Sequence, residues 1–361
     1  MRVNSTPGNF VDLDRLRGIA AVLVLIDHAG CLLLGRDLVP RNLLAVQFFF
    51  MLSGFVVACG YEARMLSGMS ARGFILRRAI RLYPLLLLGA AFGTGALLVT
   101  DPAFAADPQA MLSVLMAILC LPIMQETAFG FGRFPINPPE WSLFFEIAAN
   151  LGFAMLLPLI RKQILVLVAI GTSATYAVVT IAYWPGSLPF WCEGIGATGA
   201  FSTGIVLWRL HCQARKPRRT LGRWSLAILP VILAAICMAP PSLGPVVTPL
   251  ATLVIFPAII LAVAANGRSP GGSTALGALS YPLYILHWPI LLLAREWIMP
   301  LIGAPLTVPV ACAVACCCAG AALTTFDIPV RTRLARALLA PGLPLRSPGH
   351  PSRTGIAPQR V

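Results

Sequence analysis

The sequence predicts an all-α protein, a polytopic bundle of about ten (10–11) transmembrane helices. Of its 361 residues, 58% are hydrophobic and only 11% are charged. A soluble domain carries roughly 25% charged residues, so a soluble protein of this length could not cover its surface with so few charges. The mean hydropathy of +0.83 supports the same conclusion. Disorder is excluded too, because disordered chains have low hydrophobicity. The chain is therefore expected to lie in a lipid bilayer.

Apolar stretches long enough to cross a bilayer recur along the chain. A crossing helix needs about 20 mostly apolar residues, and breaks that carry proline, glycine or charge separate the candidates. The candidates are 16–34, 43–60, 84–99, 141–160, 163–183, 194–210, 224–239, 246–265, 276–298 and 303–325. An eleventh apolar run, 110–124, is shorter and contains Pro122 near its end.

Basic residues predict which helix ends face the cytoplasm, since Lys and Arg are retained in cytoplasmic loops. With the N-terminus inside and the ten long candidates crossing, 23 of the 27 Lys and Arg residues fall on the cytoplasmic side. If 110–124 also crossed, the basic loops 161–162 and 209–223 and the C-terminal segment would move outside. The charges therefore favour ten crossings, both termini in the cytoplasm, and a non-crossing or re-entrant 110–124.

Two parts of the chain are expected. Residues 1–330 form a membrane domain, and residues 331–361 form a basic, Pro- and Arg-rich disordered cytoplasmic tail with some attraction to anionic lipid. A cleaved signal peptide is not expected, because the first 15 residues are polar and no small-residue cleavage site follows the first apolar stretch.

The net charge could indicate a nucleic-acid partner and the cysteine content a metal site, but neither fits the positions of these residues in the sequence. A formal net charge of +14 would suggest nucleic acid in a soluble protein, but basic cytoplasmic loops explain it here. Most of the ten cysteines lie in apolar runs, where cysteine acts as a small hydrophobic residue, and none has zinc-ligand spacing. We therefore expect buried free thiols, no metal site and no nucleic-acid partner.

Ionisable residues inside a membrane span are costly and usually functional, and the first span holds the clearest set. In RGIAAVLVLIDH, Arg17 and His28 are close to three helical turns apart, which places both on one face, roughly 16 Å apart along the axis. Such a stripe suits a ligand that enters lengthwise with an anionic end. The alternative is a snorkelling Arg17 and a His28 bonded to a neighbouring helix. Asp27 points about 100° away and either orients the imidazole or packs against another helix.

The second span contains FFFMLSGFVV, in which Ser53 and Gly54 interrupt an apolar run. Small residues in membrane spans favour close helix packing. Because the GxSxG pattern of a nucleophilic serine is absent, packing rather than catalysis is expected here.

Four arginines precede the third span in RGFILRRAIRLYP. They are Arg72, Arg77, Arg78 and Arg81. The apolar residues between them predict a short interfacial helix that leads into the span. Arginines bind phosphate groups through paired hydrogen bonds, although the positive-inside rule explains any single one equally well. Their combination with the first span favours a phosphate-binding role.

The segment WSLFFEIAAN puts a polar stripe on an apolar helix. Ser142, Glu146 and Asn150 are spaced four residues apart and share one face. A carboxylate inside a span is expensive unless it is paired. Glu146 is therefore expected to have a cation or a histidine as its partner, or to be protonated.

A second stripe occurs in SYPLYILHWPI, where Ser280, Tyr284 and His287 share a face. Pro282 and Pro289 should bend this helix and free backbone carbonyls. His287 is either a second functional imidazole or a structural hydrogen-bond partner.

The order of these motifs resembles the acyltransferase-3 family of membrane O-acyltransferases. R-x10-H, FF-x-LSGF, RLYP, WSL-x-x-E and SYPLYILHWP follow one another over about residues 12–325. Asp27 departs from the family pattern, which has an apolar or aromatic residue there, and no added periplasmic esterase-like domain is evident. The matched positions are Arg17, His28, Arg78, Arg81 and Glu146, and further motif positions are matched by Ser53, Gly54, Tyr284 and His287.

The resemblance implies an acyl-CoA donor, usually acetyl-CoA, which is a co-substrate rather than a permanently bound cofactor. His28 would act as general base on the acceptor hydroxyl or carry the acyl group covalently across the membrane, and Glu146 would orient or share the proton of the imidazole. We expect three groups of site residues: catalytic His28, Glu146 and Arg17; donor-binding Arg77, Arg78 and Arg81; and substrate-contacting Ser142, Tyr284 and His287.

The implied acceptor is a hydroxyl group of a cell-envelope or secreted glycan or of a lipid-linked sugar, at the bacterial inner membrane. Lipopolysaccharide, capsule, secreted glycan, a lipo-oligosaccharide and a small secondary metabolite all fit the sequence. A transporter is the competing class, since intramembrane His, Glu and Arg also build substrate paths, but no inverted repeat is seen. A sensor or assembly subunit without catalysis is a third possibility, against which the intact motifs argue.

Overall fold

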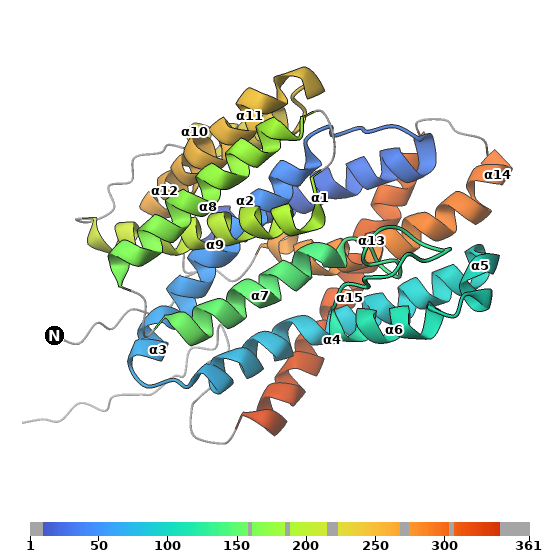
Figure 1. Ribbon diagram of the computed structural model, residues 1–361, viewed down its shortest axis with the longest axis horizontal. Coiled ribbons are helices and arrows are strands. Elements are labelled where there is room, and N and C mark those ends of the chain that lie inside the picture. Colours follow the sequence, from blue (N-terminus) through green and yellow to red (C-terminus); the bar gives the residue numbers. More distant parts are fainter. Residues whose placement is uncertain are drawn as a thin grey trace, which may run out of the picture.

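The computed structural model is helical throughout the residues that it describes, which are 10–157, 161–184, 188–214, 223–267, 274–302 and 307–339. Long helices that run obliquely to the long axis make up the molecule (Figure 1), and no strand occurs in these ranges. The predicted all-α bundle is therefore confirmed.

The first half of the chain contributes eight helical segments. They are α1 (Val11–Leu34), α2 (Asn42–Val57), the π-helix η1 (Ala58–Glu62), α3 (Ala63–Leu66), α4 (Ala71–Thr100), α5 (Pro102–Ala106), α6 (Ala110–Leu119) and α7 (Glu140–Leu156).

The second half adds the remaining described segments. They are α8 (Lys162–Ala182), α9 (Phe190–Gln213), α10 (Arg223–Cys237), the 3-10 helix η2 (Pro241–Leu243), α11 (Gly244–Leu250), the π-helix η3 (Ala251–Ile255), α12 (Phe256–Ala265), α13 (Ala275–Trp297), α14 (Met299–Ile302) and α15 (Thr307–Leu338).

The bundle has two ends, which we name after their residues. The basic end contains the first turns of α1 and α4 with Arg17 and Arg78, and the far end contains the last turns of the same helices, up to Leu34 and Thr100. Figure 1 shows α3 at the basic end and α5 and α14 together at the far end. Helix α13 packs against α1, α4 and α15 and runs from the basic end to the far end.

Helices α2 and α9 are packed so closely that their backbones nearly touch. A Cβ atom on Gly54 of α2 would collide with the carbonyl oxygen of Phe201, and one on Gly204 of α9 would collide with that of Met51. Small residues permit this approach between membrane helices. The sequence interpretation of the LSGF segment as a packing element is therefore confirmed for Gly54.

Six described helical segments are long and apolar enough to cross a membrane. They are Val11–Leu34, Asn42–Leu66, Ala71–Thr100, Lys162–Ala182, Pro241–Ala265 and Ala275–Leu301. The count of about ten crossings is not confirmed and stays a prediction. Helix α6, in the run 110–124, has ten residues. At 1.5 Å per residue such a helix is about 15 Å long, which is half the hydrocarbon thickness and fits a non-crossing segment.

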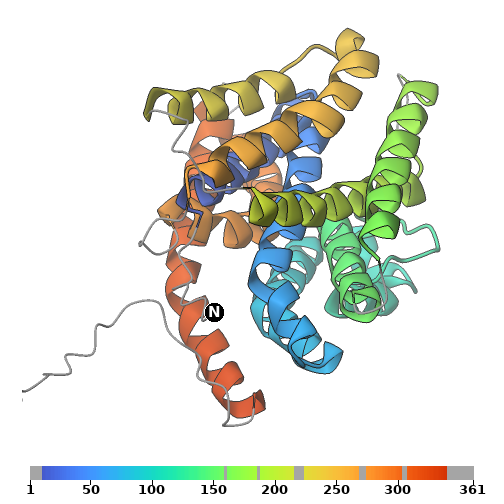
Figure 2. The same ribbon diagram turned by 90° about the vertical axis from the view of Figure 1, so that its left-hand side faces the viewer.

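Two helices differ in extent from the sequence expectations. The expected interfacial helix and the span after Pro84 form one continuous 30-residue helix, α4. Proline is tolerated inside membrane helices where neighbouring groups satisfy the freed backbone. Helix α15 continues through Arg331 to Leu338 and projects from the rest of the bundle (Figure 2). Residues 340–361 of the expected tail lie outside the described residues.

Two carboxylates fasten connections at the far end. Helix α1 ends at Leu34, and the following Gly35 has a φ of 64°, which glycine adopts without strain. In the connection to α2, Asp27 accepts hydrogen bonds from the Val39 N–H (2.8 Å) and from Asn42 (2.5 Å). Asp107 accepts from the backbone N–H groups of Ala128 and Gln109, and these bonds lower the pKa of Asp107. The connections thus have defined courses despite their lack of regular structure.

We predict that Gly54→Ala destabilises the protein, because the added methyl group meets the backbone of α9, which can yield only if the helices separate. Overpacking of this kind costs about 1–3 kcal/mol. The matched control is Gly95→Ala in α4, whose Cβ would meet nothing within 4 Å. Thermal unfolding in detergent should show a lower Tm for Gly54→Ala alone; equal Tm values for both variants would contradict the close packing of α2 and α9.

Candidate active site

A cavity of about 120 Å³ lies at the basic end of the bundle, with residues of α1, α2, α4, α7 and α13 in its wall. Most of its lining is apolar, with aromatic side chains such as Phe49 and Phe50. Its charged lining residues are Asp14, Arg17, Arg78, Arg81 and Glu146. We call this space the basic cavity. It brings together ionisable residues that the sequence placed on three separate helices.

Glu146 is the centre of a polar cluster that joins three helices. Its Oε1 accepts a hydrogen bond from Nη2 of Arg78 in α4 (2.7 Å) and another from Oγ of Ser53 in α2 (2.8 Å). The Arg78 side chain is 8% exposed and that of Glu146 is 22% exposed. The expectation that Glu146 has a cationic partner is thus confirmed. Ser53, which was expected only to permit packing, also donates a hydrogen bond to this carboxylate.

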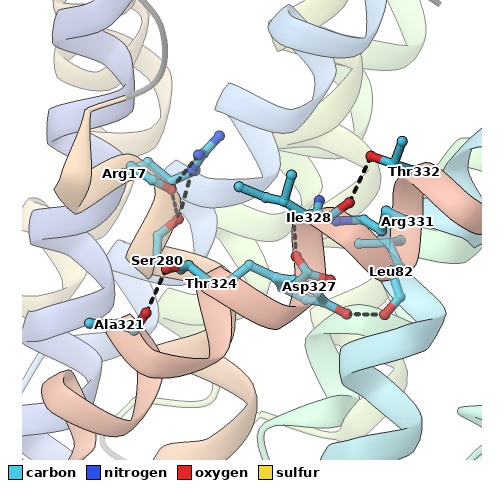
Figure 3. A network of polar contacts seen from close by, with 11 residues as sticks. Arg17, Leu82, Ser280, Ala321, Thr324, Asp327, Ile328, Arg331 and Thr332 are labelled. Carbon is cyan, nitrogen blue, oxygen red and sulfur yellow. Dashed lines mark hydrogen bonds and ion pairs between the residues drawn. The ribbon is translucent and has the colours of Figure 1, made fainter. Parts of the chain in front are cut away.

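Arg17 connects α1 to the start of α13, as Figure 3 shows for its contact with Ser280. Its Nε donates to Oγ of Ser280 (2.9 Å), and its Nη2 donates to the carbonyl of Gly277 (2.6 Å). Asp14, one turn earlier, forms an ion pair with the same guanidinium at 3.2 Å. Arg17 therefore holds two helices together while it lines the basic cavity, which differs from a snorkelling arginine.

The remaining predicted donor-binding arginines have different surroundings. Arg81 lines the basic cavity, is exposed, and forms no ion pair with a described residue. Arg77 donates to the carbonyl of Gly73 in its own helix (2.9 Å) and does not line the cavity. The structure thus brings Arg78 and Arg81 to the cavity and leaves Arg77 outside it.

The predicted stripes on α7 and α13 meet inside the bundle. Ser142 and Tyr284 line the basic cavity, and their hydroxyl oxygens are 2.8 Å apart. The ring of Tyr284 also packs against the ring of His287, with 5.9 Å between centroids. Tyr284 therefore connects the basic cavity to the histidines that lie deeper in the bundle.

His28 and His287 form a direct pair between α1 and α13. Nδ1 of His28 lies 2.7 Å from Nε2 of His287, and the rings stack with centroids 5.0 Å apart. His287 is buried, with 1% exposure. Trp288 packs edge-on against His28 at 5.3 Å.

The hydrogen bonds of His287 define the tautomer of His28. Nδ1 of His287 lies 3.1 Å from the Leu283 carbonyl, which can only accept, so this nitrogen carries the proton. In a neutral His287, Nε2 then accepts the bond from Nδ1–H of His28. A neutral His28 consequently keeps the lone pair on its own Nε2, which is the requirement for a general base.

One expectation about the partners of His28 is corrected. Glu146 does not orient this imidazole, because its hydrogen bonds are to Arg78 and Ser53, while His287 takes the orienting position. Of the two alternatives for Asp27, the structure shows the contact with another helix, since its oxygens accept from Val39 and from Asn42 of α2. His28 itself does not line the basic cavity.

The sequence analysis missed Asn137, which satisfies a backbone group released by proline. Pro289 has no N–H, so the carbonyl of Ile285, four residues earlier, lacks its helical donor. Nδ2 of Asn137 donates to that carbonyl at 3.0 Å and also to Oε1 of the fully buried Glu140 at 3.0 Å. The expectation that a proline of α13 frees a carbonyl is confirmed. A freed carbonyl inside the bundle requires a buried hydrogen-bond donor, and this requirement was the sequence signal for Asn137.

One group among the described residues brings metal-ligating atoms together. Ligand atoms of Asp27, Cys31 and Asp37 lie within 4.8 Å of one another at the far end of α1. Both oxygens of Asp27 already accept hydrogen bonds from the following turn.

The eight cysteines whose side chains the structure describes are thiols that form no disulfide. Cys120, Cys237 and Cys316 are buried as expected, whereas Cys31 and Cys212 are exposed, so the expectation of buried thiols holds only in part.

Comparison with known proteins supports an acyl-transfer role for this arrangement. A family model described as an acyltransferase domain matches residues 10–324. The chain belongs to the acyltransferase-3 family. This confirms the resemblance of its motifs and identifies it as a membrane acyltransferase, which agrees with its apolar helices.

Two relatives match different shares of this acyltransferase-3 chain. "Protein 2 in picA locus" of Rhizobium radiobacter is 33% identical over 162 residues, which cover 42% of this chain and 83% of that protein. "Putative membrane-bound transacylase BcsY" of Komagataeibacter xylinus is 28% identical over 300 residues, which cover 79% of this chain and 73% of that protein. No solved structure matches the chain significantly.

We predict that Arg78→Ala destabilises the protein more than Arg77→Ala. Removal of one partner from a largely buried ion pair leaves a desolvated charge, at a cost of about 3–5 kcal/mol when burial is complete and less for the partly exposed Glu146. The hydrogen bond that the structure shows for Arg77 is to Gly73 of its own helix. Unfolding in detergent should separate the two variants, and adding Glu146→Gln to Arg78→Ala should restore part of the Tm. Equal Tm values for the single variants would contradict the pairing.

Proposed function

We propose that this acyltransferase transfers an acyl group, most simply acetyl, from acyl-CoA to a hydroxyl group of a cell-envelope or secreted glycan at the bacterial inner membrane. The observation that carries the proposal is the basic cavity, whose wall contains Arg81, which has no ion-pair partner among the described residues, and Tyr284, which packs against His287 of the histidine pair. The site thus combines an anion-binding entrance with a base at its inner end.

The charges at the basic end suit the phosphates of CoA. Asp14 pairs with Arg17 and Glu146 pairs with Arg78, which leaves Arg81 without an ion-pair partner among the described residues. Arginine binds phosphate oxygens through two parallel hydrogen bonds. The apolar lining beyond these charges suits the pantetheine arm, whose thioester would approach the histidine pair past Tyr284.

The histidine pair supplies the proton transfer. Nε2 of His28 removes the proton from the acceptor hydroxyl as its oxygen attacks the thioester carbonyl. When the C–S bond breaks, the imidazolium returns the proton to the departing CoA sulfur, and the products are an ester and free CoA. General base catalysis of this kind contributes about 10²–10⁴-fold in rate.

A covalent relay is the second form of the same function. His28 would attack the thioester itself, release CoA and hold the acyl group until the acceptor hydroxyl takes it. A relay leaves acylated protein when the acceptor is absent, and direct transfer does not. Rapid quenching with radiolabelled acetyl-CoA separates these two mechanisms.

We predict that Arg81→Ala weakens acetyl-CoA binding about 10- to 100-fold, the effect of losing a hydrogen bond to a charged group. Arg81 is the suitable choice because it is exposed and its removal leaves no buried partner. Arg72→Ala is the matched control, since Arg72 is exposed on the same helix and lies outside the basic cavity. Calorimetry on the purified protein measures both; equal affinities would refute the placement of the phosphates, and no binding by the folded wild type would favour a transporter.

We predict that His28→Ala abolishes acyl transfer while the protein still binds acetyl-CoA within about threefold of the wild type. His287→Leu, which removes the orienting acceptor, should lower kcat about 10- to 100-fold with a similar affinity, a smaller loss than that of the base. Transfer assays and calorimetry give the two quantities. Normal turnover by His28→Ala would contradict the role of the imidazole as the general base.

A further inference from the structure

A second cavity, of about 110 Å³, lies at the far end of the bundle. Its wall combines the last turn of α4, the segment 128–135 and the last turns of α13. We call it the far cavity. Its position at the opposite ends of α4 and α13 separates it from the basic cavity, and the two share no lining residue.

One aromatic ring separates the far cavity from the histidine pair. Trp288 lines the cavity, and its ring packs edge-on against His28 with 5.3 Å between centroids. On the cavity side, Trp288 meets the ring of Phe131 at 5.6 Å. A ligand seated against Trp288 is therefore separated from the His28 imidazole by one indole ring.

The charges of the far cavity differ from those of the basic cavity. Arg295 donates through Nε to Glu296 (2.7 Å), so its charge is balanced locally, and Asp101 adds a carboxylate. Oδ1 of Asp101 accepts from the Ala103 N–H (3.0 Å), and the hydroxyl of Thr100 donates to Ala96 (2.8 Å). The surroundings therefore disfavour an anion such as a CoA phosphate.

Neutral, polyhydroxylated ligands match this lining. The free lone pairs of Asp101 and Thr100 accept hydrogen bonds from hydroxyl groups, and the terminal amino groups of Arg295 donate them. The aromatic rings of Phe131 and Trp288 offer apolar surface to the C–H faces of a sugar ring. Polar and apolar surface contribute about equally to the wall of the far cavity, which suits a ligand that carries both hydroxyl groups and C–H faces.

We propose that the far cavity binds the acceptor, as a neutral sugar unit, on the side of the membrane opposite to the acyl-CoA donor. This inference rests on the proposed function and adds to it a second substrate site with its own residues. His28 then lies between donor and acceptor, and Trp288 is the part of the far-cavity wall that packs against it.

Substitutions in the far cavity test this assignment. Asp101→Asn keeps an oxygen that can cap the Ala103 N–H but removes the charge, and Arg295→Gln removes the guanidinium donors. The matched controls are Glu126→Gln, an exposed carboxylate in the same far-end connection, and Trp297→Phe, an exposed ring in the last turn of α13. Neither control residue lines the far cavity.

Two measurements separate acceptor binding from donor binding. Transfer is measured as the acetate that base releases from the cell's own envelope polysaccharide. Donor affinity is measured by calorimetry with acetyl-CoA. We expect Asp101→Asn and Arg295→Gln to lower transfer at least tenfold with donor affinity within twofold, while the controls keep wild-type values. Unchanged transfer, or an equal loss of donor affinity, would overturn the inference. A wild type that neither binds acetyl-CoA nor transfers acetate would instead remove the proposed function, and the inference with it.

A thiol reagent that does not cross membranes tests the side. Ala128 is exposed and lines the far cavity, so Ala128→Cys should react in intact cells with a charged methanethiosulfonate. The reaction should block transfer at least tenfold, whereas the unsubstituted chain, with its exposed Cys31 at the same end, should keep its activity. Protection of the introduced thiol from the reagent, or full transfer after its modification, would show that the acceptor does not enter here.

Discussion

The ion pair between Arg78 and Glu146 is the interaction on which the site depends. It joins α4 to α7, and Ser53 of α2 adds a third helix through the same carboxylate oxygen. Without its partner, either charge would be costly in an apolar bundle. The pair therefore fixes the register of three helices around the basic cavity. It also explains how a carboxylate can lie among the arginines of the basic cavity without neutralising all of them, since Arg81 stays unpaired among the described residues.

A second, independent set of polar contacts joins α1 to α13. Arg17 binds Gly277 and Ser280 near one end of α13, and His28 binds His287 deeper in the bundle. Two polar contacts on the same pair of helices, separated by nearly three turns, define both their rotation and their axial position. The geometry at Nε2 of His28 is therefore set by contacts that are themselves buried and directional.

Much of the site could be predicted from the sequence, because polar residues stand out in apolar helices. Arg17, His28, Glu146 and His287 were found in this way, and the bundle brings them into two neighbouring clusters. Their partners could not be predicted, since His28 and His287 are 259 residues apart and helical spacing says nothing about which helices adjoin. Asn137 was missed because it lies before a helix, where an asparagine has no apolar background.

The span count shows a related limit. Hydropathy describes a helix that faces lipid, whereas α9 is rich in glycine and packs closely against α2 and α8. A helix enclosed by its neighbours has no need of uniform hydrophobicity. Among the described residues, length and hydropathy identify six candidates, and α9 is not one of them.

Helix α13 lines both cavities, with Ser280 and Tyr284 at one and Trp288 and Arg295 at the other. A ligand that displaces this helix along its axis alters both binding sites in a single movement. Thermodynamic linkage then requires reciprocity: whatever factor one ligand imposes on the affinity for the second, the second imposes on the first. The ligand affinities of the two cavities can thus be coupled through a shift of α13 alone, with no change in the fold between them.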